Sequence, residues 1–283
     1  MNIEVLFSKW GACELLDTGD RLKLERFGDV TVIRSEPKAW WGKSDPGLWN
    51  GADARYLDDD RKNSRWEFYK KVNAPVLDFR GVKFATKFME GSKHLGVFPE
   101  QSPHWEYIAA MGAKRKSPRL LNLFGYTGAA SLVAAAAGYS VTHVDASKPS
   151  VDWARKNQQI SGLSGAPVRW IVDDALKFAQ REARRGAKYD AIVLDPPAFG
   201  RGPKNELWKL EKMLPELLLA CSKILSENPM FALMTLYSID ASSIMAANML
   251  AAHFPEMKIS CGELALPCGR FPLPLSLWSL AEA

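Results

Sequence analysis

The chain has 283 residues, of which 47% are hydrophobic and 24% are charged, and its formal net charge is +5. Because no apolar run approaches the ~18 residues that cross a bilayer, the sequence predicts a soluble globular protein and excludes a membrane-spanning one. The mild positive charge permits an anionic partner without requiring one.

The first part of the chain, residues 1–112, predicts a small β-rich domain that could bind substrate. The segment "DRLKLERFGDVTVIRSEP" indicates a hairpin that turns at Gly28-Asp29, and "VLDFRGVKFATKF" indicates another near Arg80-Gly81. Four tryptophans of this part could stack on unpaired bases, although we favour a place in its core: Trp40, Trp41, Trp49 and Trp66.

Residues 113–283 predict an α/β domain, which follows the basic hinge "AKRKS". Short apolar runs alternate here with longer helical patterns, which is typical of a parallel sheet covered on both faces. The expected strands are "RLLNLF" (119–124), "SVTHVD" (140–145), "VRWIVD" (168–173), "YDAIVLD" (189–195), "MFALMTL" (230–236) and "KISCGELAL" (258–266). A helix is predicted from Leu207 to Ile224, and Pro215 is expected to kink or restart it.

Other sequence features bear on the compartment and on metals. The start "MNIEVLFSKW" lacks the basic and apolar regions of a signal peptide, so the cytoplasm is the expected compartment. No CxxC spacing suggests a disulfide framework or a zinc site, and His94 and His104 have no ligand partner at suitable spacing. We therefore expect no metal. The four cysteines are Cys13, Cys221, Cys261 and Cys268.

Ligands of an open parallel sheet bind beyond the carboxyl ends of its strands. At the first such end, "NLFGYTGAAS", Gly125 and Gly128 allow tight turning and the next helix presents free N–H groups. Asp145 ends the second strand 20 residues after Gly125. At this separation a carboxylate accepts a hydrogen bond from a ribose hydroxyl. At the third end, one of Asp173 and Asp174 is a helix cap and the other meets adenine, with a slight preference for Asp174.

The fourth strand end, "LDPPAFG", separates two cofactors that the first three ends fit equally, NAD and S-adenosylmethionine. A dehydrogenase has no need for this sequence, whereas an enzyme that methylates a base does. Asp195 can accept from an amine, the carbonyls of Pro196 and Pro197 are expected to lack local donors, and Phe199 offers a face for stacking. An ordinary strand-terminating turn is the alternative interpretation.

With these residues assembled, the sequence resembles class I S-adenosylmethionine-dependent methyltransferases. It is similar to the group that includes the large-subunit ribosomal RNA enzymes acting on cytosine C5 or guanine N7. The motifs that carry the resemblance stand in the order and spacing of that group: "GVFPEQ", "NLFGYTGAAS", "HVDASKPSVDWARKNQ", "VDDALKF" and "LDPPAFG". The resemblance implies a Rossmann-like seven-stranded sheet with an antiparallel last strand.

The resemblance also implies the cofactor contacts. Asp145 and Ala146 would lie at the ribose, Asp174 at the adenine, and Asp195 nearest the sulfonium and its methyl group. The remaining contacts would come from the loop after the first strand and from the segment ahead of the cofactor fold: Phe124, Gly125, Thr127, Gly128, Phe98 and Gln101.

The residues after the fifth strand favour methyl transfer to a base nitrogen over transfer to a base carbon. Cytosine C5 requires a thiolate that adds to the ring first, but the place where the group carries that cysteine reads "TLYSID" here. We therefore expect direct in-line transfer to a base nitrogen, in which alignment supplies most of the acceleration. The expected catalytic residues are Asp195, Pro196 and Phe199. Substrate contacts are expected from Phe199, Arg201, Lys204 and Tyr237, with Lys114–Lys116 extending a basic track.

Other functions remain open at this point. The substrate could be a protein or a small molecule, because the region before residue 80 shows no recognisable RNA-binding module. A nucleic-acid-binding protein with a vestigial cofactor pocket is a further alternative, although the loop from Gly125 to Gly128 and Asp145 argue against it. An NAD oxidoreductase is disfavoured by "DPPAF".

Overall fold

The computed structural model describes residues 3–58 and 64–283. The chain divides into two compact units, each assembled from separated segments. The larger unit comprises His104–Leu264 together with both chain ends, Met1–Leu6 and Ser276–Ala283, and the smaller unit comprises Phe7–Pro103 and Ala265–Leu275. A single boundary at residue 112 does not describe this division, because the first strand and most of the first α-helix belong to the larger unit.

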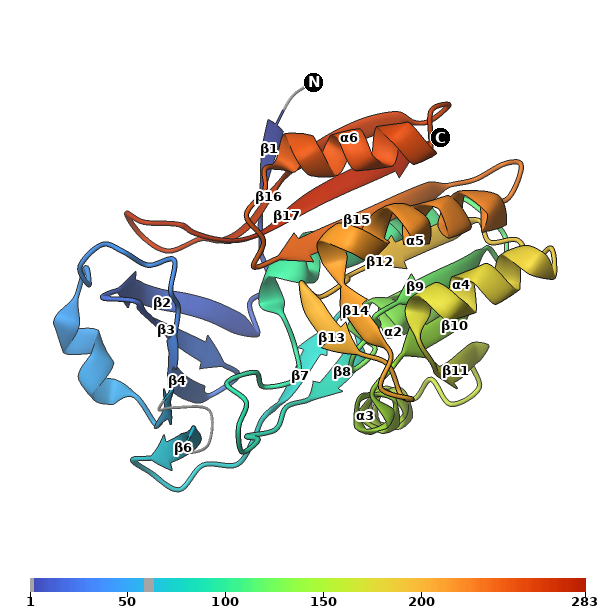
Figure 1. Ribbon diagram of the computed structural model, residues 1–283. Helices are drawn as coiled ribbons and strands as arrows, with labels where there is room; N and C mark the ends of the chain where they lie inside the picture. Colours follow the sequence, from blue (N-terminus) through green and yellow to red (C-terminus); the bar gives the residue numbers. More distant parts are fainter. Residues whose placement is uncertain (1–2, 59–63) are drawn as a thin grey trace. The chain divides into compact units, whose positions relative to one another are not determined.

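The larger unit is built on an eight-stranded sheet with the order β1-β16-β17-β15-β12-β9-β10-β11 (Figure 1). The predicted α/β class is confirmed, because β11, β10, β9, β12 and β15 are successively parallel and β17 is antiparallel to β15. The strands are β1 (Ile3–Phe7), β9 (Arg119–Leu123), β10 (Ser140–Asp145), β11 (Val168–Val172), β12 (Ala191–Leu194), β15 (Phe231–Tyr237), β16 (Lys258–Leu266) and β17 (Leu273–Glu282).

The edge strand β1 is an addition to the expected seven strands. It lies next to β16, and the backbone of Glu4 passes close to Gly262 of β16. A Cβ atom at Gly262 would overlap the backbone of Glu4, so only glycine fits this position. The sequence analysis did not predict this strand, because its residues Val5, Leu6 and Phe7 form a short apolar run without the strict alternation of a half-buried strand.

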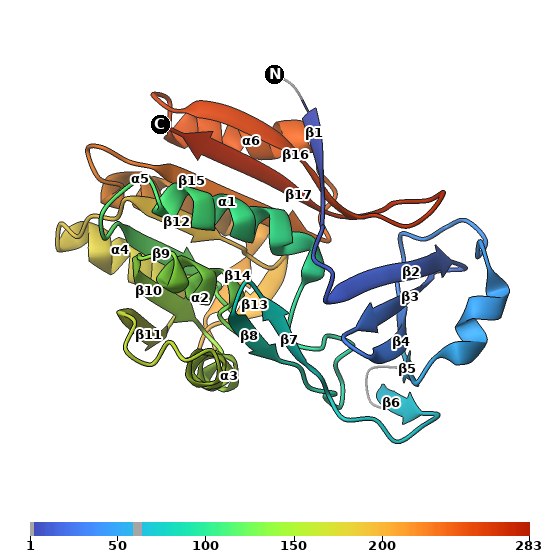
Figure 2. The same cartoon turned by 180° about the vertical axis from the view of Figure 1, so that it is seen from behind.

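Helices cover both faces of this sheet. One face packs against α4 (Ala175–Arg184), α5 (Leu210–Ile224) and α6 (Ser243–His253), in front in Figure 1. The other face packs against α1 (Ser102–Gly112) and α2 (Ala129–Ala136), in front in Figure 2, with α3 (Lys148–Ile160) beside α2. Buried aliphatic side chains of β9, β12 and β15 alternate between the two cores, as expected for strands covered on both sides.

The structure differs from the sequence expectation for α5 in two ways. The helix is continuous from Leu210 to Ile224 with Pro215 inside it, so it does not restart there, and a kink at Pro215 remains a prediction. Leu207 is not part of it but belongs to β14 (Leu207–Lys209), which forms a short antiparallel pair with β13 (Phe199–Arg201). Leu207 is 45% exposed, whereas the helix residues that follow the same spacing are buried.

The smaller unit is rich in β-structure, as predicted. Its five-stranded sheet has the order β2-β3-β4-β5-β6, and β7 and β8 form a separate pair. Both predicted hairpins are confirmed, since Gly28 (φ +59°) joins β3 to β4 and Gly81 (φ +89°) lies between β7 and β8. The strands are β2 (Cys13–Gly19), β3 (Leu22–Phe27), β4 (Val30–Ser35), β5 (Ala54–Leu57), β6 (Arg65–Phe68), β7 (Val76–Phe79) and β8 (Val82–Ala85), with 3-10 helices η1 (Pro46–Gly51) and η2 (Pro99–Gln101).

The tryptophans of the smaller unit divide between core and surface. Trp49 is buried and its indole N–H donates to Asp17 Oδ2 at 2.8 Å, while Trp41 and Trp66 are half-buried. Trp40 is 79% exposed, so the expected place in the core is wrong for this residue. Within the described residues, no helix is long and apolar enough to cross a membrane.

His104 on α1 predicts a measurable pH dependence of stability. It is 4% exposed, and burial lowers its pKa from 6.5 to about 3. Below pH 6.5 the unfolded chain binds a proton at His104 that the folded chain does not bind. The contribution of the neutral His104 ring to stability is therefore fully present above pH 6.5 and decreases progressively as the pH falls toward 3. Moving from pH 7 to pH 5 should therefore remove about 2 kcal/mol through this side chain.

The measurement is urea unfolding of wild type and His104→Phe at both pH values. The loss of unfolding free energy between pH 7 and pH 5 should be smaller in His104→Phe by about 2 kcal/mol. An equal loss in both proteins would show that His104 protonates normally in the folded state.

Candidate functional site

The carboxyl ends of five strands lie side by side at one edge of the larger unit's sheet. The registers place Leu194 of β12 opposite Leu123 of β9, and Leu123 opposite Val144 of β10. Asp145 pairs with Val172 of β11, and Leu194 also pairs with Met234 of β15. The predicted site residues that follow these strands are thereby brought together: Phe124, Gly125, Asp145, Asp173, Asp174, Asp195 and Tyr237.

The loop after β9 has a strained backbone. Phe124 (φ +60°) and Tyr126 (φ +49°) lie in the left-handed region, which costs a non-glycine residue of order 1 kcal/mol or more. Gly128 (φ +86°) follows, and a Cβ atom there would lie 2.8 Å from Cβ of Ala154. The loop thus passes close to α3 and presents the amino end of α2, whose first turn has unpaired N–H groups by construction.

Asp145 is fixed at the end of β10 by this loop. Its Oδ2 accepts from the backbone N–H of Tyr126 and its Oδ1 from that of Ser147, each at 2.8 Å. Burial raises the pKa of the Asp145 carboxyl, and these two N–H groups act in the opposite direction. The carboxylate is therefore oriented at the strand end, with Ala146 half-buried beside it.

A chain of buried polar side chains packs against the loop, and no pattern in the sequence indicates it. Asn122 Nδ2 donates to Ser131 Oγ at 2.9 Å, and Ser131 Oγ lies 3.0 Å from His143 Nδ1. Burial holds the pKa of His143 at about 3, so its ring is neutral. The ring lies directly against Gly125, where a Cβ atom would overlap it.

Gly125→Ala should therefore weaken binding to this loop strongly. The added methyl group must displace either the buried His143 ring or the loop backbone, and a displacement of about 1 Å costs up to a hundredfold in a positioned site. Isothermal titration with S-adenosylmethionine, the cofactor that the resemblance implies, measures the effect. Gly165→Ala is the matched control, because neither Gly125 nor Gly165 has a positive φ and nothing lies within 4 Å of a Cβ added at Gly165. Equal losses in both variants would contradict the crowding argument.

The structure assigns the capping role after β11 to Asp174. Asp174 is 5% exposed, and its Oδ1 accepts from the Lys177 backbone N–H at 2.9 Å as the N-cap of α4. Asp173 instead pairs with Arg181 and accepts from the backbone N–H of Asp174. The residue favoured for adenine is thus also the cap, and the cap bond uses only one of its two carboxylate oxygens.

Asp195 follows β12 next to the loop, with its backbone N–H donating to Leu123 O at 3.3 Å. Pro196 is buried and Pro197 is exposed. The expectation that both proline carbonyls lack local donors is wrong for Pro197, whose oxygen accepts from the indole N–H of Trp208 at 2.7 Å. The Pro196 carbonyl follows Asp195 directly in the chain. Among the described residues, no donor to this carbonyl is found.

Trp208 is a residue of the candidate site that the sequence did not indicate. It lies on β14, is 3% exposed, and its ring centroid lies 5.0 Å from that of Phe124. One side chain thus contacts both the glycine loop and the segment after β12. The continuous helical spacing from Leu207 concealed it, because that spacing placed residue 208 on the solvent side of a helix.

Phe199 begins β13 and presents its ring to solvent, since it is 56% exposed. Arg201 and Lys204 are exposed in the same hairpin, where Arg201 Nη1 donates to Asn205 Oδ1 at 2.8 Å. Glu206 accepts from the backbone N–H of Lys204 and from Lys177 Nζ, which closes the turn. The hairpin therefore carries an exposed aromatic ring and exposed cations beside Asp195.

The basic segment 114–116 does not lie at this edge. Arg115 Nη1 pairs with Asp190 Oδ1 at 3.0 Å and donates to Asn228 O at 2.6 Å. Asp190 precedes β12 and also accepts from the backbone N–H of Arg119, the first residue of β9. These residues mark the amino ends of the strands, so the expectation that Arg115 extends a substrate track is wrong.

Within the described residues, none of the cysteines follows β9, β10, β11, β12 or β15, the five strands whose carboxyl ends form this edge. All four cysteines are free and buried, and burial raises the pKa of Cys221 to about 12 and that of Cys268 to about 11. Cys221 lies on the core face of α5, and Cys268 packs in the smaller unit. Tyr237 ends β15 and is half-buried. Among the residues that the structure describes, no group of His, Cys, Asp or Glu could hold a metal ion.

Phe98 and Gln101 belong to the smaller unit. Gln101 ends η2 and is 9% exposed, whereas Phe98 is half-buried with its ring centroid 5.1 Å from that of His94. Their contact with a cofactor remains a prediction.

Comparison with known proteins identifies the family. The family model of S-adenosylmethionine-dependent methyltransferases matches residues 81–255, which is more than half of the chain. The chain belongs to this family. An S-adenosylmethionine-dependent methyltransferase from Agrobacterium tumefaciens has 41% identity and a TM-score of 0.95, over 100% of this chain and 94% of that one.

More distant relatives agree on the fold. A putative S-adenosylmethionine-dependent methyltransferase from Streptococcus mutans has 18% identity and a TM-score of 0.75, over 97% of this chain and 76% of that one. Ribosomal RNA large subunit methyltransferase K/L from Shewanella frigidimarina is 33% identical over 56% of this chain. The chain spans only 22% of that relative's length.

The methyltransferase uses S-adenosylmethionine as its cofactor, and the residues at the strand ends fit this group. The loop after β9 presents the free N–H groups at the amino end of α2, and Asp145 is oriented as a hydroxyl acceptor. When bound, S-adenosylmethionine supplies an electrophilic methyl group on a sulfonium. Asp145, Asp174 and the loop Phe124–Gly128 are the residues of the larger unit that we expect to hold it.

Proposed function

We propose that this methyltransferase modifies a base nitrogen of large-subunit ribosomal RNA by direct in-line transfer. The observation that carries the proposal is the exposed ring of Phe199 in the segment that Asp195 begins. An unpaired base can stack on such a ring, which contributes roughly 1–3 kcal/mol. Arg201 and Lys204 in the same hairpin are exposed cations suited to phosphates.

The proposed mechanism assigns orientation rather than covalent chemistry to the protein. Asp195 accepts a hydrogen bond from an exocyclic amine of the base, and the Pro196 carbonyl accepts the second amine hydrogen. These acceptors align the nitrogen lone pair and stabilise the positive charge that develops on it. Guanine N7 has an available lone pair without deprotonation, and stacking on Phe199 would then be the main aid to alignment.

The buried state of the cysteines supports transfer to nitrogen rather than to cytosine C5. Addition to the C5–C6 bond requires a thiolate at the base, but the raised pKa of Cys221 and Cys268 keeps both thiols protonated near neutral pH. The Shewanella relatives are large-subunit ribosomal RNA methyltransferases, which supports RNA as the substrate.

The test incubates the purified protein with methyl-labelled S-adenosylmethionine and ribosomal RNA stripped of its proteins, followed by nucleoside mass spectrometry. We expect label in large-subunit RNA, on a nitrogen, and much less in small-subunit RNA as the control. Label on a pyrimidine carbon would overturn the proposed mechanism. Label found only in protein or in small molecules of an extract would overturn the proposed substrate.

A further inference from the structure

The loop that follows β4 in the smaller unit, residues 36–43, presents an aromatic ring to solvent. Trp40 of this loop is 79% exposed, and its indole N–H donates to Pro37 O at 2.7 Å. The guanidinium group of Arg21 lies over the ring, 5.9 Å from its centroid, and donates to the same Pro37 oxygen at 3.4 Å. Because the indole N–H is used within the protein, the exposed part of Trp40 is its π-system, with a cation held beside it.

The backbone of loop 36–43 is bound to the turn between β2 and β3. The Arg21 backbone N–H donates to Ala39 O at 2.8 Å, and that of Asp20 donates to Trp41 O at 2.7 Å. These two bonds hold the residues on either side of Trp40. The ring is therefore positioned before any ligand binds, and a rigid aromatic side chain loses little conformational freedom on binding.

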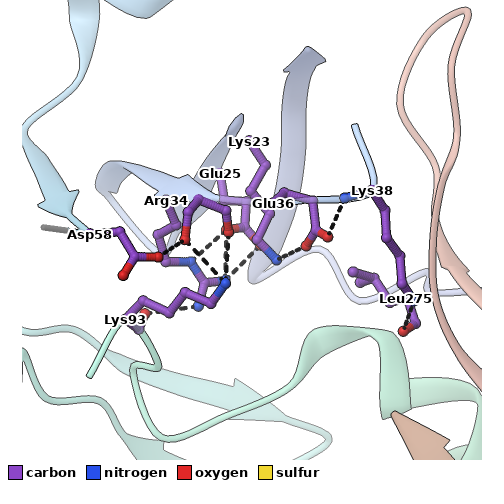
Figure 3. A network of polar contacts seen from close by, with 9 residues as sticks. Lys23, Glu25, Arg34, Glu36, Lys38, Asp58, Lys93 and Leu275 are labelled. Carbon is purple, nitrogen blue, oxygen red and sulfur yellow. Dashed lines mark hydrogen bonds and ion pairs between the residues drawn. The ribbon is translucent and has the colours of Figure 1, made fainter. Parts of the chain in front are cut away.

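Buried charges fasten the beginning of the same loop (Figure 3). Lys38 Nζ donates to Leu275 O at 2.6 Å, and the Lys38 backbone N–H donates to Glu36 Oε1 at 3.4 Å. Glu36 is 7% exposed, and its carboxylate lies 3.4 Å from Lys23 Nζ. Both ends of the segment that leads into Trp40 are thus tied to other parts of the smaller unit.

A second aromatic side chain with a cation continues this surface. The ring centroid of Phe271 lies 5.7 Å from that of Trp41, and the guanidinium carbon of Arg270 lies 5.1 Å from the Phe271 centroid. Arg270 is exposed, as is Arg21. Cations outnumber carboxylates among the charged side chains of these segments that reach the surface: Arg21, Lys38, Lys43 and Arg270 against Asp20 and Asp45.

A positioned ring beside cations matches the chemistry of unpaired RNA. An unpaired base stacks on an aromatic side chain, and the cations around the ring contact the phosphates that flank the base. A duplex fits the cations but not the ring, because its bases are already stacked on one another. The surface therefore favours single-stranded over double-stranded RNA.

We propose that Trp40, together with Arg21 and Arg270, binds an unpaired segment of the RNA substrate. The inference deepens the proposed function and rests on its assignment of RNA as the substrate. It gives the smaller unit a part in RNA affinity, through residues other than Phe199, on which the target base is proposed to stack.

Fluorescence anisotropy with a labelled single-stranded RNA of about 12 nucleotides tests the proposal. Trp40→Ala should raise the Kd about five- to a hundredfold, the loss expected when one base no longer stacks. Trp40→Phe should keep most of the affinity, because it retains a ring. The double variant Arg21→Gln/Arg270→Gln should lower the slope of log Kd against log salt concentration by about 1.4, since each lost phosphate contact removes about 0.7.

Two substitutions in the same unit are matched controls. Phe68 is an aromatic residue on β6 that is 48% exposed, and Arg80 is an exposed turn residue with a φ of +52°, close to the +61° of Arg21. Phe68→Ala and Arg80→Gln should leave the Kd nearly unchanged. The same RNA annealed to its complement is the control for stacking, and it should bind wild type and Trp40→Ala alike.

The outcomes separate this inference from the proposed function. Equal Kd values of wild type and Trp40→Ala for unpaired RNA would overturn the inference, and so would equal losses for unpaired and paired RNA. A wild type without measurable affinity for unpaired RNA would also overturn it. A Trp40-dependent affinity for unpaired RNA, without methyl label in ribosomal RNA, would overturn the proposed function alone.

Discussion

Asp195→Ala should lower kcat by about 10²–10³-fold while the fold is retained, because it removes an acceptor placed where charge develops on the substrate nitrogen. Asp195 follows β12, and its backbone N–H donates to Leu123 O beside the glycine loop. Asp195→Asn should retain more activity, since the amide oxygen can still accept from an amine. Initial rates of methyl transfer at saturating donor and RNA measure the effect.

Asp152→Ala is the control for the loss of an acidic residue. Asp152 lies on α3, where its partly exposed carboxylate pairs with Lys148 and Arg155. Its removal should change kcat by less than about twofold, as exposed pairs contribute little. A kcat of Asp195→Ala as high as that of Asp152→Ala would exclude a catalytic role for Asp195.

Trp208→Ala should destabilise the protein by about 3–5 kcal/mol, the usual cost of truncating a buried aromatic side chain. The substitution removes the ring that packs on Phe124 and leaves the Pro197 carbonyl without the indole N–H. Trp208→Phe keeps most of the packing but not the donor, so it should cost about 1–3 kcal/mol. Urea unfolding followed by circular dichroism gives these free energies.

Trp40→Ala provides the matched comparison, because Trp40 is a tryptophan that is 79% exposed. Its replacement should change the free energy of unfolding by no more than about 0.5 kcal/mol. If Trp208→Ala unfolds at the same urea concentration as Trp40→Ala, Trp208 does not hold the glycine loop to the segment after β12.

Much of the site follows from the sequence because parallel strands end at one edge. Once the apolar runs before Phe124, Asp145 and Asp195 are recognised as neighbouring strands, their convergence is a geometric necessity. The alternation of strands and helices also indicates which residues are buried. These features depend on local pattern and on a topology with few alternatives.

The features that the sequence did not indicate depend on contacts between distant residues or on competition between roles. Trp208 donates to Pro197 only because residues 199–209 form a hairpin, and the helical spacing from Leu207 pointed elsewhere. Asp174 caps the amino end of α4 and is also the residue expected to contact the adenine of the cofactor. One carboxylate can do both, so the spacing in the sequence cannot assign the two roles to different residues. Arg115 is basic and close in sequence to β9, but its partner Asp190 places it at the amino ends of the strands.

The position of β1 has a consequence for how the protein is made. Its five residues complete the edge of a sheet whose neighbouring strand, β16, is encoded near the other end of the chain. During synthesis from the amino end, β1 emerges first but cannot pair until β16 has left the ribosome, and the intervening chain includes nearly all of the smaller unit. That unit can complete most of its own strands in the meantime. Closure of the sheet edge is therefore expected to be a late, long-range step in folding, and the backbone N–H and C=O groups that β1 uses to pair with β16 are accessible to chaperones until then.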